Sequence, residues 1–147
     1  MKQITLNAPF SVKAKGLHTG MGMEAQFLPA PDKHGYKMQR TDLEGEPVID
    51  ALAENVIHTE RGTVIARGEV SVSTIEHAMA ALYAAGIDNV LIRINGAEMP
   101  ILDGSAREIS EKIQSVGVVS QNENKDYYIV KQKLEVRDDA TGALILV

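Results

Sequence analysis

Glu76 and His77 are neighbouring residues whose side chains could perform chemistry together. A carboxylate can accept a proton from water, and a neutral imidazole can bind a zinc ion. The pair lies in the run Ser73-Thr74-Ile75-Glu76-His77-Ala78, and the residues that follow favour a helix as far as Gly86. Free N–H groups at a helix start favour an ionised Glu76 and a neutral His77. The pair therefore predicts half of a metal hydrolase site.

Helix geometry divides the roles of these two residues. Neighbouring side chains on a helix point about 100° apart, so Glu76 and His77 do not form a ligand pair as readily as residues four positions apart. One of them could bind the metal while the other reaches a water beside it. Ser73 and Glu76 also fit a capping box, in which both side chains only satisfy backbone groups at the helix start. The local sequence leaves both interpretations open.

Composition narrows the class of protein. The chain has 147 residues, 44% of them hydrophobic, which is enough for one ordinary domain with a core. Its formal net charge of −5 and the lack of a basic cluster argue against a nucleic-acid partner. Without cysteine, a metal would need His, Asp or Glu ligands. No signal peptide or membrane-spanning stretch is visible, so we expect a cytoplasmic protein.

The order of expected elements indicates an α+β fold. Short alternating segments with turn residues between them predict strands from Gln3 to about Val72. A helix is expected from about Thr74 to Ala85, a buried strand over Asn89–Ile94, and a second helix over Ala106–Val116. We expect a two-layer domain in which a β-sheet packs against helices.

The last part of the chain predicts the beginning of another domain. Residues 120–125 are polar and are expected to be structureless. Two strands, at 127–136 and 143–147, are predicted around a turn at 138–142. A domain rarely ends on an open apolar strand, so we expect a truncated chain, although a dimer partner could pair with that edge. The predicted division is an amino-terminal domain at 1–120, a linker at 121–126 and the first strands of a second domain at 127–147.

Five segments in order resemble one family, the bacterial UDP-3-O-acyl-N-acetylglucosamine deacetylases, which are zinc amidases of lipid A synthesis. The segments are Gly16-Leu17-His18-Thr19-Gly20, Arg40-Thr41-Asp42-Leu43, Ser73-Thr74-Ile75-Glu76-His77, Gly86-Ile87-Asp88-Asn89 and Pro100-Ile101-Leu102-Asp103-Gly104-Ser105-Ala106. The resemblance is with the amino-terminal domain of that family. It implies a pseudo-repeat of two similar α+β domains that face one another across the active site.

The resemblance also implies roles for single residues. His77 would be a zinc ligand and Glu76 the general base that acts on water. The other family ligands form a His-Lys-x-x-Asp pattern in the second domain, which this chain lacks. The implied cofactor is Zn²⁺, with one ligand here, and the implied substrate is a UDP-linked, O-acylated N-acetylglucosamine. By itself, without its second domain, we expect this chain to be inactive.

Several further residues are candidates for supporting roles. His18 lies in a glycine-rich turn, where it either contacts the substrate or tolerates unusual backbone angles. Thr59 and Thr63 fall where the family has a loop beside the metal and the acyl chain. Asp103 is expected to cap the second helix, alone or through Ser105, with an active-site support role as the alternative.

Four other polar residues receive a structural interpretation. His34 and His58 are expected on the surface in polar loops, and Arg40 with Asp42 is explained equally well by an ion pair as by a sugar site. Two alternative functions remain. The chain could be a non-catalytic α+β binding or assembly module, or a hydrolase whose site a second copy completes, with His18, Asp103 or Glu76 joining His77.

Overall fold

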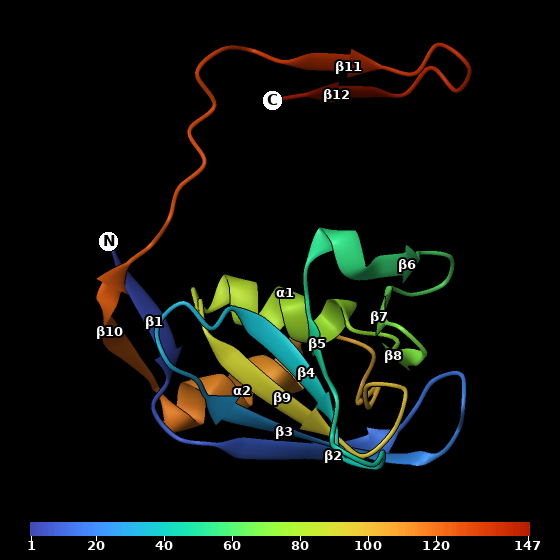
Figure 1. Ribbon diagram of the computed structural model, residues 1–147, viewed down its shortest axis with the longest axis vertical. Helices are drawn as coiled ribbons and strands as arrows, with labels where there is room; N and C mark the ends of the chain where they lie inside the picture. Colours follow the sequence, from blue (N-terminus) through green and yellow to red (C-terminus); the bar gives the residue numbers. More distant parts are fainter.

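The main sheet of the computed structural model, which describes all 147 residues, contains five strands in the order β2-β3-β9-β4-β5 (Figure 1). Strands β4 and β9 run parallel, and the other neighbours run antiparallel. The bounds are β2 Phe10–Lys15, β3 Gly22–Pro29, β4 Tyr36–Arg40, β5 Val48–Asp50 and β9 Val90–Ile94.

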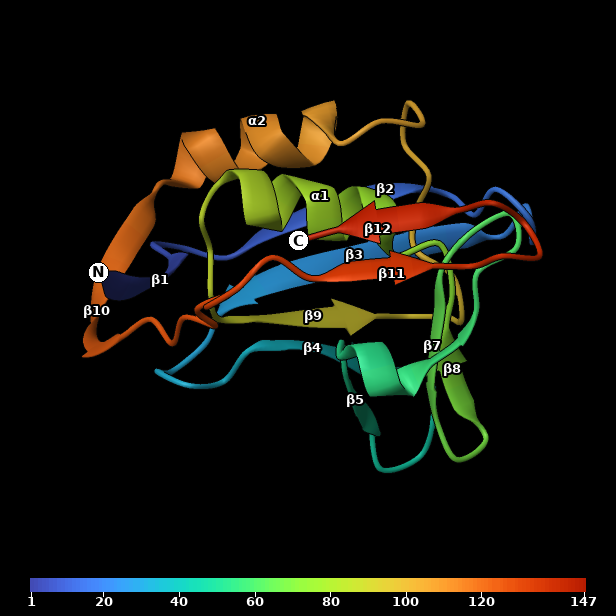
Figure 2. The same cartoon turned by 90° about the horizontal axis from the view of Figure 1, so that it is seen from above.

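Alternation of apolar residues explains which face of this sheet is covered. Along β3, Met23, Ala25 and Phe27 are buried, whereas Glu24 and Gln26 are only partly so. Figure 2 shows both α-helices, α1 Glu76–Ala84 and α2 Arg107–Val116, on the same side of the sheet. The core between the sheet and the helices includes Phe27, Ile92, Leu82, Ile109 and Ile113. The predicted α+β class is therefore confirmed.

The two helices pack in different ways. Helix α2 buries Ile109 and Ile113, four residues apart on one face, while α1 buries Ala78, Ala81 and Leu82. Both predicted helices exist, but α1 begins two residues later than expected. Neither helix has the length and apolar content needed to cross a membrane.

A smaller sheet lies at one end of the main sheet and contributes to the candidate site. Its strands are β6 Val56–His58, β7 Val64–Arg67 and β8 Val70–Val72, preceded by a 3₁₀ turn, η1, at Ala53–Asn55. Arg40, at the end of β4, connects the two sheets. Its guanidinium pairs with Asp42 at 2.7 Å and donates to the Ser71 carbonyl at 2.7 Å. The hydrogen bond from Arg40 holds the pKa of Asp42 below its ordinary value.

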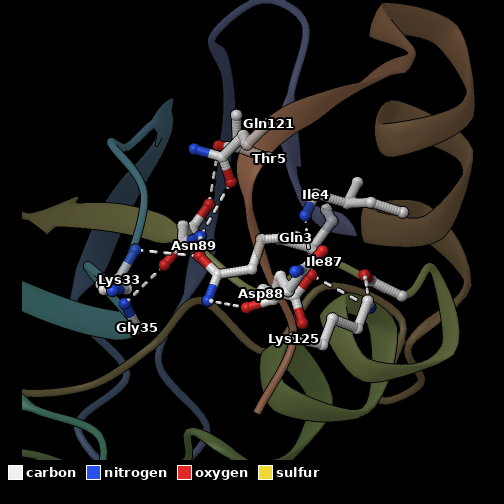
Figure 3. Close-up of polar contacts among 12 residues, drawn as sticks. Gln3, Ile4, Thr5, Lys33, Gly35, Ile87, Asp88, Asn89, Gln121 and Lys125 are labelled. Atoms are coloured by element: carbon white, nitrogen blue, oxygen red, sulfur yellow. Dashed lines mark hydrogen bonds and ion pairs between the residues drawn. The ribbon is translucent and has the colours of Figure 1, made fainter. Parts of the chain in front are cut away.

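Strands β1 Lys2–Leu6 and β10 Val118–Asn124 pair antiparallel and bring the start of the chain beside residues far along it. The expected structureless segment at 120–125 is therefore wrong for residues 120–124. Polar side chains hold it in place instead of apolar ones. Asn89 donates to Gln3 Oε1 at 2.9 Å and to Gln121 Oε1 at 2.8 Å (Figure 3). Gln121 in turn donates to the Ala30 carbonyl at 2.9 Å. The polar side chains of Gln3, Asn89 and Gln121 are thus hydrogen-bonded, and Leu6 at the end of β1 adds an apolar side chain to the core.

The last two strands form a hairpin apart from the rest of the fold (Figure 1). They are β11 Glu135–Arg137 and β12 Leu144–Leu146, joined through the predicted turn. The predicted strand at 127–136 is wrong for residues 127–133, which have no regular structure. Leu134 exchanges two backbone hydrogen bonds of 2.9 Å with Val147 and so extends the hairpin pairing by one residue. All residues from Asp126 to Val147 are exposed. The division into domains remains a prediction.

Candidate active site

The chain turns sharply just before α1, at Thr74. This residue is buried and has φ of +59°, which is unusual for a β-branched side chain and costs about 1–3 kcal/mol. The helix therefore starts after the turn, at Glu76, and its N-cap Ile75 offers no side-chain hydrogen bond. Backbone strain of this kind is retained where the surrounding contacts determine it, and such places are often functional.

Ser73 does not cap the helix. Its hydroxyl donates to the Ala97 carbonyl at 3.1 Å, and its backbone N–H donates to the same oxygen at 2.9 Å. Its own carbonyl accepts from Met99 N at 3.0 Å. The capping-box interpretation is therefore wrong, because Ser73 binds the segment at residues 97–99 instead of the first turn of α1.

The carboxylate of Glu76 has one oxygen held and one available. Oε2 accepts a hydrogen bond from Thr63 N at 2.9 Å, which fixes the direction of the side chain. Oε1 lies 3.8 Å from His77 Nε2, with both side chains about one-third exposed. A carboxylate that is oriented through one oxygen and open at the other suits a general base.

His18 joins this pair from a distant part of the sequence. Its Nε2 donates to the Arg61 carbonyl at 3.2 Å, which places the ring proton on that nitrogen. Gly62, the next residue, has φ of +153°. A methyl group on Gly62 would lie 3.6 Å from Glu76 Oε1 and 3.8 Å from both His18 Nε2 and Thr74 Oγ1. The two predicted site residues His18 and Glu76 therefore face the same small space.

A polar hollow of about 310 Å³ opens beside this space. His18, His58, Arg61 and Thr74 are among the residues that line it. His58 is exposed, as expected, but it borders the candidate site, which its sequence surroundings did not indicate. Imidazole, guanidinium and hydroxyl groups are suited to a polar or anionic ligand.

The other predicted site residues are placed differently. Thr63 contacts Glu76 only through its backbone N–H, whereas Thr59 is exposed and makes no hydrogen bond to the cluster. Asp103 accepts hydrogen bonds from the Ser105 backbone at 3.0 Å and hydroxyl at 2.8 Å and pairs with Arg107 at 2.7 Å. The Ser105 hydroxyl in turn accepts from Arg107 N, at the first residue of α2. The polar contacts of Asp103 are therefore local to the helix start.

Glu98 is a residue of this region that the sequence interpretation missed. It is fully buried and accepts four hydrogen bonds, from His18 N, Thr19 N, Thr19 Oγ1 and Thr74 Oγ1. Burial acts to raise the pKa of Glu98, but the hydrogen bonds from His18, Thr19 and Thr74 outweigh it and hold the pKa below its ordinary value. The sequence feature that could have identified Glu98 is its position as a single carboxylate directly before the apolar residues 99–102.

The cluster around Glu76 and His77 supplies few donors for a catalytic zinc ion. No group of three or more His, Asp or Glu side chains lies close enough to hold a metal ion. A catalytic zinc normally has three protein ligands. The partly exposed imidazole of His77 fits one of these positions, so the site in this chain is at most one part of a metal centre.

Comparison with known proteins identifies the family. Residues 3–146 match the family model described as UDP-3-O-acyl N-acetylglycosamine deacetylase. The chain belongs to this family. The similarity of the five segments noted in the sequence is thus part of a match over nearly the whole chain.

Relatives of the deacetylase family share much of the sequence. The chain is 57% identical over 147 residues to the bifunctional enzyme LpxC/FabZ of Bacteroides thetaiotaomicron, covering 100% of the chain and 32% of that relative. It is 41% identical over 138 residues to the UDP-3-O-acyl-N-acetylglucosamine deacetylase of Cellvibrio japonicus, covering 94% and 46%. The chain is 41% identical over 144 residues to the deacetylase of Geobacter sp. strain M21, and the match covers 98% of the chain and 47% of that relative. The chain thus spans a third to a half of the length of these relatives.

Proposed function

We propose that these residues are the amino-terminal part of a zinc-dependent deacetylase of lipid A biosynthesis that acts in the cytoplasm. Its substrate would be a glycolipid precursor, UDP-3-O-acyl-N-acetylglucosamine, whose acetamide is hydrolysed. The observation that supports this most directly is the carboxylate of Glu76, held at one oxygen by Thr63 and open at the other beside His77. Membership of the deacetylase family supplies the reaction class.

Zinc bound by His77 would supply Lewis-acid polarisation of the acetamide carbonyl and activation of a water molecule. The residues of this chain then have defined tasks. Glu76 Oε1 takes the proton of the attacking water, while the Thr63 N–H keeps the carboxylate from rotating away. A bond forms between the water oxygen and the carbonyl carbon, the carbon–nitrogen bond breaks, and the leaving nitrogen takes up the proton that Glu76 removed from the water. The products are acetate and a free amine.

The remaining ligands would come from outside these 147 residues. His77 is the only metal ligand that we assign to the chain, and no cluster in it completes a site. We therefore propose that the chain needs its own second domain for activity and that the isolated chain is inactive. The polar hollow beside His18 and Arg61 would receive part of the substrate.

The test uses the full-length protein with Glu76→Gln, His77→Ala and the control Glu111→Gln, which changes an exposed glutamate with no ion pair on α2. Because a general base contributes roughly 10²–10⁴-fold, Glu76→Gln should lower kcat by that amount while the zinc content stays unchanged. His77→Ala should lose both zinc and activity. Glu111→Gln should resemble the wild type.

Two outcomes contradict the proposal. If Glu76→Gln loses less than about tenfold in kcat, Glu76 is not the base. If the wild-type full-length protein releases no acetate from the substrate, the chain is better explained as a binding or assembly module that retains the family fold.

A further inference from the structure

Glu98 carries a buried charge with no cationic partner. Its side chain is fully buried, and no Lys, Arg or His lies within ion-pair distance. All four of its hydrogen-bond donors are neutral. A buried carboxylate is costly unless its surroundings are arranged for it. The arrangement around Glu98 therefore calls for an explanation beyond filling the core.

The four hydrogen bonds connect two loops that are far apart in the sequence. Oε1 accepts from His18 N at 2.8 Å and from Thr74 Oγ1 at 3.3 Å. Oε2 accepts from Thr19 N at 2.9 Å and Thr19 Oγ1 at 2.7 Å. One oxygen of Glu98 thus receives donors from the loop that carries His18 and from the turn that leads into Glu76.

The backbone on either side of Glu98 strengthens this connection. Ser73 forms an isolated parallel bridge with Glu98, and Met99 N donates to the Ser73 carbonyl at 3.0 Å. Further along, Ile101 N donates to the Lys15 carbonyl at 3.0 Å. The segment from Ala97 to Ile101 therefore lies between the two loops and is bonded to both.

Two backbone features accommodate the carboxylate. Gly16 has no side chain, and a methyl group there would overlap Glu98 Oε2 and lie 2.5 Å from Thr19 Oγ1. Thr74 adopts a left-handed conformation that turns its hydroxyl toward Glu98. Each feature is understandable if the position of the Glu98 carboxylate is what the surrounding chain must preserve.

We propose that Glu98 is a positioning residue, which holds the His18 loop and the start of α1 at a fixed separation so that His18 and Glu76 face the same space beside Gly62. Its catalytic consequence rests on the proposed function, whereas the connection itself does not. Glu98 touches neither the reacting groups nor a metal ligand. It acts through the backbone of His18 and through Thr74.

The first experiment compares Glu98→Gln with Glu111→Gln in the full-length protein. Glutamine keeps the shape but puts an NH₂ group where two donors need an acceptor. Because small displacements of catalytic groups cost up to about 10²-fold, kcat should fall by at least about tenfold, with KM changed less than about threefold. The zinc content should stay unchanged, since His77 is not touched.

Hydrogen exchange provides a readout that does not depend on the reaction. In Glu98→Gln, the amides of His18 and Thr19 should exchange faster, because the carboxylate is their acceptor. The amides of β9 in the main sheet should keep their protection. A general loss of protection in β9, or exchange at His18 and Thr19 equal to the wild type, would overturn the proposal. Wild-type kcat in Glu98→Gln would also overturn it, whereas an inactive wild-type protein would count against the proposed function only.

A second pair of variants tests the same contact from the opposite side. Gly16→Ala should displace the Glu98 carboxylate. It should therefore reproduce the kcat loss of Glu98→Gln and the faster amide exchange at His18 and Thr19. Gly22→Ala is the matched control, because a methyl group there meets nothing within 4 Å and Gly22 has no left-handed backbone. Combined with Glu98→Gln, Gly16→Ala should add little, since both changes break one set of hydrogen bonds. Fully multiplicative losses would contradict a shared contact.

Discussion

Both α-helices are preceded by a serine, and an acidic side chain lies near each start, but these side chains bind different partners. At α2, Asp103, Ser105 and Arg107 contact one another, so the helix start is made by its own neighbours. At α1, Ser73 binds Ala97 and Glu76 binds Thr63. The start of α1 is thus held by distant segments.

The difference shows how a site is built at a helix start. Local side chains satisfy backbone groups at a helix start at little cost. At α2 the Ser105 hydroxyl does so for Arg107 N, although the N-cap residue Ala106 has no side-chain hydrogen bond of its own. At α1, the polar side chains are directed away from the backbone of the helix, and Thr74 carries backbone strain. Departures from local rules concentrate at functional sites, so the start of α1 is where we expect substitutions to affect activity more than stability.

The largest expected difference is in kcat, between the variants Gly62→Ala and Gly104→Ala. Both glycines have positive φ, +153° and +77°, so both substitutions should destabilise the protein by about 1–3 kcal/mol. Only at Gly62 would the methyl group lie beside the proposed general base, 3.6 Å from Glu76 Oε1. We expect kcat to fall at least about tenfold in Gly62→Ala and to stay near wild type in Gly104→Ala, as measured by steady-state kinetics. Equal kcat in the two variants would remove the contrast.

A smaller contrast should appear in stability between Ser105→Ala and Ser73→Ala. Ser105→Ala removes the acceptor at the first N–H of α2 and should lower the free energy of unfolding by about 1 kcal/mol. Ser73→Ala removes one hydroxyl contact to Ala97 and leaves the α1 backbone groups as they are. Urea unfolding measures both. A lower helix stability in Ser73→Ala, seen as faster amide exchange throughout α1, would restore the capping interpretation.

The smallest expected difference concerns acid stability. The pKa of Asp103 is lowered by the hydrogen bond from the Ser105 hydroxyl, and the pKa of Glu98 is also lowered. A lowered folded-state pKa stabilises the protein above the unfolded-state pKa, near 4, and this stabilisation is lost as the pH falls through the folded-state pKa. The stability difference between wild type and Glu98→Gln should therefore shrink between roughly pH 5 and pH 3.

Asp103→Asn serves as the exposed comparison for this acid titration. Water screens the charge of Asp103, so the stability difference between Asp103→Asn and the wild type should shrink less over the same pH range. Urea midpoints at several pH values measure both variants. A difference for Glu98→Gln that grows on acidification would contradict the direction given for its pKa.

Sequence patterns predicted elements well where local and tertiary preferences agree. The alternation in β3 and the spacing of Ile109 and Ile113 in α2 each identify the buried face. The start of α1 was placed two residues early because Ser73 has all the features of a cap and no local signal of its partner Ala97. Long-range hydrogen bonds of this kind leave no periodicity in the sequence.

The other differences between the sequence predictions and the structure also arise from contacts between segments that are distant in the sequence. Gln121 lies in a segment whose composition indicates a linker, yet it is held by Asn89 and Ala30, which are distant in the sequence. Glu98 appears from its neighbours to be part of an apolar extended segment, and its four donors come from two other loops. Glu76 and His77 could be chosen as candidates from sequence because their residue types are chemically informative without any partner, and their roles remain predictions.

The pairing of β1 with β10 affects when this part of the fold can form during synthesis on the ribosome. More than a hundred residues separate Leu6 from its partner Val118, and at ~5–20 residues per second their synthesis takes on the order of 5–20 s. The main sheet and α1 are synthesised during that interval, while the edge of β1 that pairs with β10 has no partner strand. The order of synthesis therefore delays completion of the β1–β10 pair until β10 has been made.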